Sequence, residues 1–348
     1  MAYTTIDDPS AYFQTQLYTG TGSSNAITND GNSDLQPDWI WLKDRSATNG
    51  HAVQDTSRGI TNVLFTNGND SENQYTNTVV DSVQSDGFTV STNANSNTNT
   101  NTYVAWQWKS QGGSTVSNSD GSITSTVQAN TDAGFSIVTY TGNGADTATV
   151  GHGLGATPKM IIFKRRDSTN NWIVYHNSLT SASNFLSLNT TDAEATASNI
   201  FDDTAPTSSV FTLGFSAAVN ANTSTFVAYC FAEKQGFSKF GSYTGNSNAD
   251  GAFVYTGFKP AFVMIKRTDS TANWHMLDNK RDPINEADAT LLANDSGAEF
   301  ESSNDVDFLS NGFKLRANQT STNVGTYIYL AFAESPLVGS DGTPTTAR

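Results

Sequence analysis

The stretch "PKMIIFKRRDSTNNWIVYH", residues 158–176, joins a short apolar run to a polar turn and then to a second apolar run. Its apolar runs are short, rich in β-branched and aromatic residues, and bounded by turn residues, which is typical of β-strands. Between them, the Asp and Ser side chains can bond nearby backbone amides, and Asn tolerates the left-handed conformation. The stretch therefore predicts an antiparallel hairpin, with Trp172 opening the returning strand.

The same phrase occurs twice more, as "PDWIWLKDRSATNGH" from Pro37 and "PAFVMIKRTDSTANW" from Pro260. In each copy a lysine follows the proline by six positions, at Lys43, Lys164 and Lys266. Each copy has a Tyr-Thr-Gly before it and a glycine-aromatic pair and an aromatic-rich run after it: Tyr18, Tyr140 and Tyr243; Gly87, Gly214 and Gly312; runs from Tyr103, Phe226 and Tyr327. Such self-similarity predicts one supersecondary plan used three times.

We therefore expect an all-β chain of three tandem homologous antiparallel β-sandwich domains. The repeats are placed at 1–110, 132–235 and 236–335. Residues 111–131, rich in Gly and Ser, account for the longer interval between the first two repeats and are predicted to form a linker. Residues 336–348 are left as a C-terminal tail.

The first copy departs from the other two at the turn. Gly50 stands where the later copies have Asn171 and Asn273, and His51 stands where they have tryptophan. A turn that needs a positive φ accepts either Gly or Asn, whereas a catalytic group would tolerate neither exchange. The recurring phrase is therefore predicted to be chiefly architectural.

Two interpretations of the tryptophans stay open. A flat indole beside amide and carboxylate groups has the composition of a shallow saccharide site, which gives these candidate ligand-binding residues: Trp172, Trp274, Asn171, Asn273, Asp167 and Asp269. Alternatively the tryptophans are core or hairpin-packing residues, as large aromatics on strands usually are. Tyr18, Tyr140 and Tyr243 carry the same two interpretations.

The composition limits the partners. Eighteen basic and 33 acidic residues give a net charge of −15, which argues against nucleic acid or an anionic membrane as a partner. The single cysteine, Cys230, lies in a buried-looking run and cannot form an intrachain disulfide. The opening "MAYTTIDDPSAYF" has neither the basic nor the apolar region of a secretory signal, so we expect folding in a cytoplasm.

No constellation of catalytic residues is predicted. The four histidines do not occupy corresponding places in the repeats or lie at metal-ligand spacing. Glu233 and Glu334 end equivalent strands, but the first repeat has Ser110 there, so a paired-carboxylate site is not expected. We predict no catalytic residue, no metal site and no cofactor. Acidic loops at 30–34, 67–73 and 305–307 do not match a calcium-loop pattern, and calcium binding stays open.

Three phrases resemble a repeated domain of virion proteins from marine tailed phages. They are "DDPSAYFQTQLYTGTG" (7–22), "TYVAWQWK" (102–109) and the stretch 134–176, which contains the opening hairpin. The resemblance covers all three repeats and brings no catalytic residues with it. It implies a β-sandwich, a position on a phage particle and often one that faces the host.

The expected function is that of a non-enzymatic virion surface protein, tail-fibre-like or part of an appendage, with host glycan as an expected ligand. A capsid decoration protein that stabilises the head lattice is the alternative, and a polysaccharide depolymerase is a less favoured one. The expected partners are other virion proteins of tail or capsid, without nucleic acid or membrane insertion. Three similar domains could make one chain a pseudo-trimer, or three chains could form a true trimer.

Overall fold

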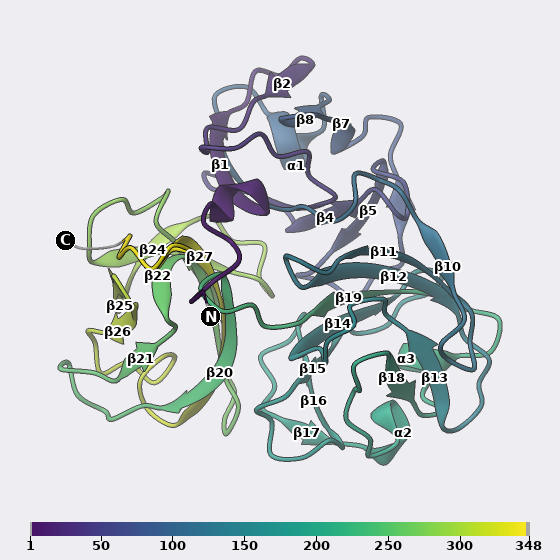
Figure 1. Ribbon diagram of the computed structural model, residues 1–348. Coiled ribbons are helices and arrows are strands. Elements are labelled where there is room, and N and C mark those ends of the chain that lie inside the picture. The colour runs from purple at the N-terminus through teal and green to yellow at the C-terminus, as the bar shows by residue number, and fades with distance from the viewer. Residues whose placement is uncertain (1, 346–348) are drawn as a thin grey trace.

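The computed structural model describes residues 2–345, except for the side chains of 303–305, and is almost entirely β. Three lobes surround a common centre (Figure 1). We call them unit 1 (residues 2–110), unit 2 (111–235) and unit 3 (236–345). The prediction of an all-β fold made of antiparallel sheets is confirmed.

Strands make up most of each unit, and units 1 and 2 also contain single-turn helices. Unit 1 contains η1 (Pro9–Ala11), β1 (Phe13–Thr19), β2 (Asn25–Ile27), β3 (Trp39–Asp44), β4 (Ala52–Asp55), β5 (Asn62–Phe65), β6 (Asn73–Gln74), β7 (Val80–Gln84), β8 (Gly87–Val90), α1 (Ala94–Asn97) and β9 (Thr102–Trp108). Unit 2 contains β10 (Val116–Asn118), β11 (Ser125–Asn130), β12 (Phe135–Thr141), β13 (Ala148–Gly151), β14 (Met160–Arg165), β15 (Ile173–His176), β16 (Asn184–Ser187), β17 (Ala195–Thr196), α2 (Ser198–Phe201), β18 (Val210–Leu213), α3 (Ala217–Asn220) and β19 (Thr225–Phe231). Unit 3 contains β20 (Ser238–Thr244), β21 (Phe253–Tyr255), β22 (Phe258–Arg267), β23 (Trp274–Asp278), β24 (Ala287–Leu292), β25 (Phe300–Leu309), β26 (Gly312–Leu315) and β27 (Thr326–Pro336).

One strand order recurs in the main sheet of every unit. It reads β1-β9-β3-β4-β5 in unit 1, β12-β19-β14-β15-β16 in unit 2 and β20-β27-β22-β23-β24 in unit 3. The strands that follow Pro37, Pro158 and Pro260 therefore hold the same central place. A smaller group of strands completes each sandwich-like unit: β2-β8-β7, β13-β18 and β21-β26-β25, the last continuous with its main sheet.

The predicted linker is part of a sheet. Residues 111–131 supply β10 and β11, and β11 pairs antiparallel with β12, with Val127 opposite Val138. Ile123 and Val127 are 6% and 1% exposed and belong to the core of unit 2. The linker prediction is therefore wrong, because alternating apolar residues within a Gly- and Ser-rich segment suffice to hold it on a sheet edge.

The C-terminal segment is also attached to the body as far as it is described. Val338 forms a β-bridge with Pro344, and the backbone N–H of Ser340 donates to the Asp7 carboxylate at 2.6 Å. Residues 346–348 lie outside the described part of the chain. Residues 336–345 therefore pack on the rest of the protein, and the prediction of a separate C-terminal tail is wrong for them.

The glycine-aromatic pairs do not all correspond. Each Tyr-Thr-Gly tyrosine meets one phenylalanine edge to face, in the pairs Tyr18–Phe88, Tyr140–Phe211 and Tyr243–Phe313. Phe211 is buried, whereas Phe215, which the Gly-Phe pattern selects, is 58% exposed. The correspondence of Gly214 with Gly87 and Gly312 is thus wrong, because strand alternation points Phe211 and Leu213 inward instead.

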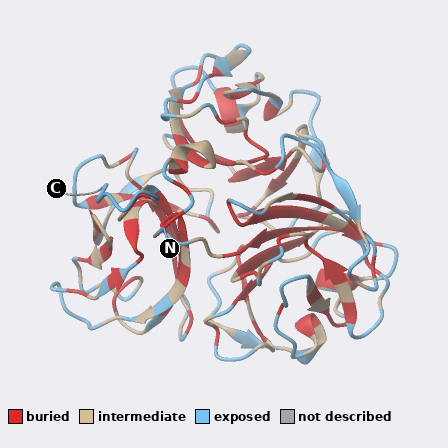
Figure 2. Ribbon diagram, viewed as in Figure 1, coloured by how far each residue is buried: buried red, intermediate tan, exposed pale blue. Residues whose placement is uncertain are grey.

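All three units contribute to one central hydrophobic core. It contains every tryptophan of the chain: Trp39, Trp41, Trp106, Trp108, Trp172 and Trp274. Trp39 stacks on Tyr229 of unit 2, with ring centroids 4.6 Å apart, and Phe13 stacks on Phe332 of unit 3 at 5.1 Å. The buried strands around the centre are seen in Figure 2. Separated units would expose this aromatic surface to water, so the core holds the units in one body.

Candidate functional site

The recurring turn phrases lie between units. The indole Nε1 of Trp172 donates to the backbone oxygen of Phe65 in unit 1 at 3.0 Å. That of Trp274 donates to the oxygen of Ser187 in unit 2 at 3.1 Å. Both side chains are 1% exposed. A buried ring cannot stack on a sugar, so the prediction of a saccharide face on these tryptophans is wrong and the packing interpretation holds.

The neighbouring asparagines shape the same turns. Asn189 accepts a bond from the backbone N–H of Trp172 at 2.9 Å and donates its amide to Asn171 at 2.9 Å. Asn294 repeats both bonds with Trp274 and Asn273, at 2.8 and 2.7 Å. Asn171 and Asn273 are thus held by partners inside their own units, which is a structural role.

Of the six predicted site residues, the two aspartates are the most open to solvent. Asp167 pairs with Arg165 at 2.7 Å, and Asp269 pairs with Arg267 at 2.6 Å. Their side chains are 36% and 42% exposed. Partial burial would raise the pKa of Asp167, but the bond from Arg165 lowers it below its ordinary value. The structure therefore does not bring these six residues together as one exposed surface.

Contacts between the units follow a closed cycle. Trp172 joins unit 2 to unit 1, and Trp274 joins unit 3 to unit 2. The hydroxyl of Thr66 in unit 1 donates to the oxygen of Ala293 in unit 3 at 2.7 Å. Each unit thus uses one face to contact the next, which gives the chain an approximate threefold arrangement.

The three recurring lysines are fully buried at these junctions. Lys164 Nζ donates to the oxygen of Asn69 in unit 1 at 3.1 Å, and Lys266 Nζ donates to that of Thr191 in unit 2 at 3.3 Å. Lys43 Nζ donates to the oxygen of Ala47 in its own turn at 3.2 Å. Burial lowers the pKa of each of the three ammonium groups to about 8. Each of the three lysines therefore stabilises backbone carbonyls by hydrogen bonds rather than binding a ligand.

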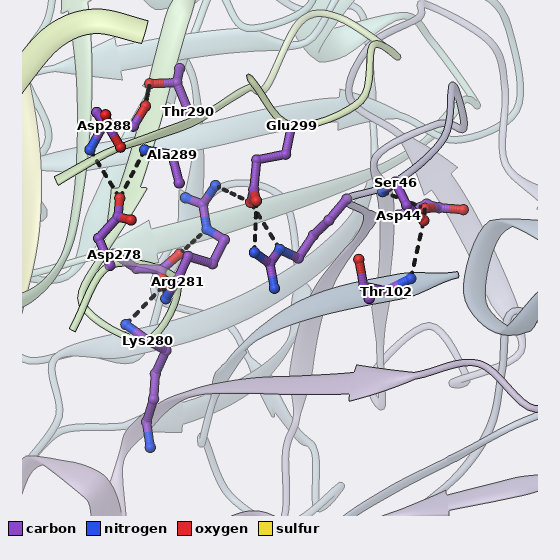
Figure 3. A network of polar contacts seen from close by, with 12 residues as sticks. Asp44, Ser46, Thr102, Asp278, Lys280, Arg281, Asp288, Ala289, Thr290 and Glu299 are labelled. Carbon is purple, nitrogen blue, oxygen red and sulfur yellow. Dashed lines mark hydrogen bonds and ion pairs between the residues drawn. The ribbon is translucent and has the colours of Figure 1, made fainter. Parts of the chain in front are cut away.

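Two glutamates bridge arginines of adjacent units. Glu299 of unit 3 accepts a bond from Arg281 in its own unit at 3.1 Å (Figure 3). It also accepts a bond from Arg45 of unit 1 at 2.6 Å. Burial would raise the pKa of Glu299, but the two guanidinium groups lower it below its ordinary value. Glu72 of unit 1 likewise accepts bonds from Arg58 in its own unit and from Arg166 of unit 2.

Behind each glutamate lies a fully buried Asp-Arg pair. Asp278 pairs with Arg281, and Asp278 also accepts the indole N–H of Trp106 from unit 1 at 3.0 Å. Asp55 pairs with Arg58 and accepts the hydroxyl of Tyr229 from unit 2 at 2.7 Å. In the sequence the two pairs appear as a recurring Asp-x-x-Arg, in "DTSR" and "DNKR".

Among the described side chains, the junction of units 2 and 3 lacks this Glu-Arg arrangement. His176 and Leu179 take the places of the buried Asp and Arg, and His176 Nε2 lies 3.3 Å from the oxygen of Tyr329. Glu194 bonds Thr180 within its own unit at 2.7 Å. Two junctions therefore contain a glutamate that bridges arginines of adjacent units, whereas the described residues of the third junction form no such bridge.

A buried asparagine in each unit is a further structural residue that sequence reasoning missed. Its side-chain oxygen accepts a backbone N–H from the loop after Tyr-Thr-Gly, in the pairs Asn97–Thr21, Asn220–Asn143 and Asn323–Asn246, at 2.8, 2.9 and 3.1 Å. The hydroxyls of Tyr18, Tyr140 and Tyr243 donate to the backbone carbonyl of the residue just before this asparagine, at 2.7, 2.8 and 2.6 Å. These tyrosines are therefore loop anchors rather than ligand contacts.

The histidines and the cysteine are buried apart from one another. Trp41 donates its indole N–H to His51 at 3.0 Å, and the backbone of Leu154 donates to His152 at 3.2 Å. Burial lowers the pKa of His176 and of His275 to about 4. Burial also raises the pKa of the Cys230 thiol. Within the described residues no group of three potential metal ligands gathers, and Asp305 of the acidic stretch lies outside them.

The best candidate for ligand binding is a polar groove around Glu334 in unit 3. Three hollows of about 220, 380 and 540 Å³ share lining residues and run together. We call them the Glu334 groove; its main lining residues are Gln14, Asp30, Asn32, Lys259, Asn279, Lys280, Asp282, Phe308, Asn311 and Glu334. It extends from unit 3 onto unit 1.

The charges in the groove are largely paired. Glu334 accepts bonds from Lys259 at 2.6 Å and from Asn279 at 2.8 Å. Lys280 of unit 3 pairs with Asp30 of unit 1 at 2.8 Å. Glu233, the other strand-end glutamate, pairs with Lys239 at 2.7 Å and does not line the groove. Amides beside paired charges suit a polar, uncharged ligand such as a neutral sugar chain.

Comparison with known proteins gives one family. A family model described as a domain of unknown function, DUF7483, matches residues 8–336 and so spans all three units. No curated protein and no solved structure matches the chain. Along residues 2–345 no helix is long and apolar enough to cross a bilayer. Because one model covers nearly all of the chain, the protein belongs to the DUF7483 family, a domain of unknown function.

Proposed function

We propose that the protein is a non-enzymatic virion surface protein of a phage, a tail-fibre-like or appendage component that binds host glycan through the Glu334 groove. The phrase resemblance at 7–22, 102–109 and 134–176 supports the virion part. The single observation that carries the binding part is the groove, which is open and polar and in which Lys259 pairs with Glu334 and Lys280 with Asp30. The repeated phrases serve architecture, which supports a role in binding or assembly.

A glycan array tests the binding part. We expect the intact chain to bind selected neutral glycans, and Asn279→Ala to weaken that binding about tenfold, as the loss of one well-placed hydrogen bond does. Asn222→Ala, which removes an exposed amide of unit 2, serves as the matched control. An array without any bound glycan would remove the adhesin function and leave the virion assignment in place.

A capsid decoration protein is the second candidate, and the closed cycle of three similar units favours it. A body with approximate threefold symmetry can present three similar surfaces to three symmetric copies of a shell protein. Counting copies per particle by quantitative mass spectrometry separates the two. A few to a few dozen copies indicate a tail component, and a hundred or more indicate the head.

A polysaccharide depolymerase is the least favoured candidate. Glu334 is already bonded to Lys259 and Asn279, and Glu233 of unit 2 is ion-paired with Lys239 of unit 3. We propose a virion-surface location with tail or capsid proteins as partners, and no cofactor or nucleic acid. Release of soluble sugar from host envelope by the purified protein would favour the depolymerase instead.

A further inference from the structure

Within residues 2–345, no strand pairs with the outer edge of β20 in unit 3. β20 is the first strand of its sheet and pairs with β27 on its other side. The backbone N–H of Gly245 donates to Gly325 across this pair at 2.8 Å. Because antiparallel pairs alternate, the groups of Tyr243 and Gly241 also face β27, while those of Phe240, Ser242 and Thr244 point outward. Such an edge is a template for a further strand.

Unit 2 shows what such an edge accepts. We call residues 121–130 the clasp. The clasp runs antiparallel along β12 and places Val127 opposite Val138. It then reaches the small sheet, where the N–H of Ile123 donates to the oxygen of Thr149 at 2.9 Å, and the hydroxyl of Ser125 donates to Gly151 at 2.8 Å. One extended segment thus closes the open side of this sandwich.

The positions under the clasp have counterparts in unit 3. Gly241 corresponds to Val138, because both lie three residues after the strand start in matched registers. Val254 of β21 corresponds to Val150, because each pairs with the phenylalanine of its small sheet. No clasp covers them within the described residues. Val254 itself is 5% exposed, and its neighbours Phe253 and Tyr255, which point to the other face of β21, are 47% and 52% exposed.

One end of this open side is already filled. The Tyr3 hydroxyl donates to the oxygen of Gly257 at 2.7 Å. The corresponding glycine of unit 2, Gly153, faces Val127 of the clasp, since a Cβ built there would lie 2.8 Å from it. The N-terminal segment therefore occupies only the last part of the place that the clasp fills in unit 2.

In unit 1 the terminal strand β1 likewise pairs with β9 on one side, but loop side chains lie at its two ends. Asn25 donates its amide to the oxygen of Thr19 at 3.4 Å, and Gln14 accepts the N–H of Gly31 at 3.0 Å. Loop residues therefore engage both ends of β1. We call the open side formed by residues 240–244 and 253–255 of unit 3 the β20–β21 edge.

We infer that the β20–β21 edge binds an extended strand of another polypeptide, which pairs antiparallel with β20 as the clasp pairs with β12. The clasp indicates the chemistry of that strand: β-branched apolar residues four positions apart, as at Ile123 and Val127, with a hydroxyl residue between them. Backbone bonds supply the affinity in this mode, and the two apolar side chains supply register. The source of the strand, a neighbouring virion protein, rests on the proposed function.

A peptide of the clasp's own sequence, "GSITSTVQAN", is the probe. It carries a fluorescent label and is titrated with the intact chain while anisotropy is recorded. We expect saturable binding to the wild type and to Ser242→Ala, which keeps the outward N–H. Ser242→Pro removes that N–H and should weaken binding at least about tenfold. Circular dichroism should show both variants folded, since residue 242 does not bond β27.

Two outcomes would overturn the inference. One is a lack of saturable binding by the wild type, and the other is equal binding by Ser242→Pro, which would place the peptide on unit 2 or elsewhere. The peptide-binding measurement does not depend on whether the protein is part of a phage particle. If mass spectrometry of purified virions fails to find the protein, the proposed function fails while the strand-binding result stands.

Discussion

The hydroxyl of Tyr229 in unit 2 donates to the carboxylate of Asp55 in unit 1 at 2.7 Å, and both residues are fully buried. Asp55 also pairs with the buried Arg58. Residues that are distant along the chain thus satisfy one another's buried polar groups at the junction. Removing one partner would leave a buried charge less satisfied, which makes the junction sensitive to single substitutions.

Tyr229→Phe deletes that donor and little else. We expect the free energy of unfolding to fall by about 1–3 kcal/mol, the cost of leaving a buried acceptor short of a bond. Denaturant unfolding measures it. Tyr75→Phe, at a tyrosine that is 38% exposed, should change stability by less than about 0.5 kcal/mol. Equal effects of the two changes would contradict the junction's role.

The two kinds of junction can be compared directly. Glu72→Gln weakens contacts with Arg58 and Arg166 at a charged junction and should cost about 3 kcal/mol. Glu194→Gln is the matched change at the junction without a Glu-Arg bridge, where the carboxylate accepts bonds from Thr180 and Asn184 in its own unit. We expect a smaller loss there by the same unfolding measurement. A larger loss for Glu194→Gln would count against ionic joining of units.

The buried lysines predict a rise in stability at alkaline pH. Burial lowers the pKa of Lys43, Lys164 and Lys266 to about 8 in the folded state, whereas the unfolded value lies near 10.5. Between these values the unfolded chain binds more protons, so the free energy of unfolding increases with pH from about 8 to about 10. Above that, the raised pKa of buried tyrosines such as Tyr229 reverses the trend.

Unfolding curves at pH 7.5, 9 and 10 test this expectation. Lys164→Met should reduce the rise by about a third, because it removes one of three similar groups. A flat or falling stability between pH 8 and 10 in the wild type would contradict the lowered lysine pKa values.

The glycine of Tyr-Thr-Gly is required for close approach. A Cβ at Gly142 would lie 2.4 Å from the backbone oxygen of Ala221. We expect Gly142→Ala to destabilise by about 1–3 kcal/mol or more, as overpacking does. Gly68→Ala is the control, since its nearest contact would be an ordinary 3.6 Å. Similar melting temperatures for both variants would refute the requirement.

The shared core predicts that the units unfold together. Trp39, Phe135 and Phe332 belong to one cluster although each comes from a different unit. Calorimetry of the whole chain should therefore show a single transition, and an isolated unit 2 should expose apolar surface and bind a hydrophobic dye. Three separate transitions would show that the units are independent domains.

The hairpins, the three repeats and the all-β class could be predicted from the sequence, because turn chemistry and residue alternation act over a few positions. The same local origin explains the errors. Residues 111–131 have the composition of a linker, and only β12, which offers an unpaired edge, turns the clasp into a strand. Gly214-Phe215 matches the glycine-aromatic pattern of the other repeats, but the alternation of side chains along β18 buries Phe211 instead.

The site could not be predicted for a related reason. An apolar strand such as "IWLK" or "IIFK" is buried on both faces, and its sequence does not say whether the second cover is its own unit or a neighbour. Trp172 and Trp274 therefore had two interpretations until the units were placed. What the sequence by itself determined was each unit's plan, which local backbone preferences set. What only the tertiary structure decided was the closed cycle of units, because burying the aromatic faces requires contacts between residues far apart in the chain.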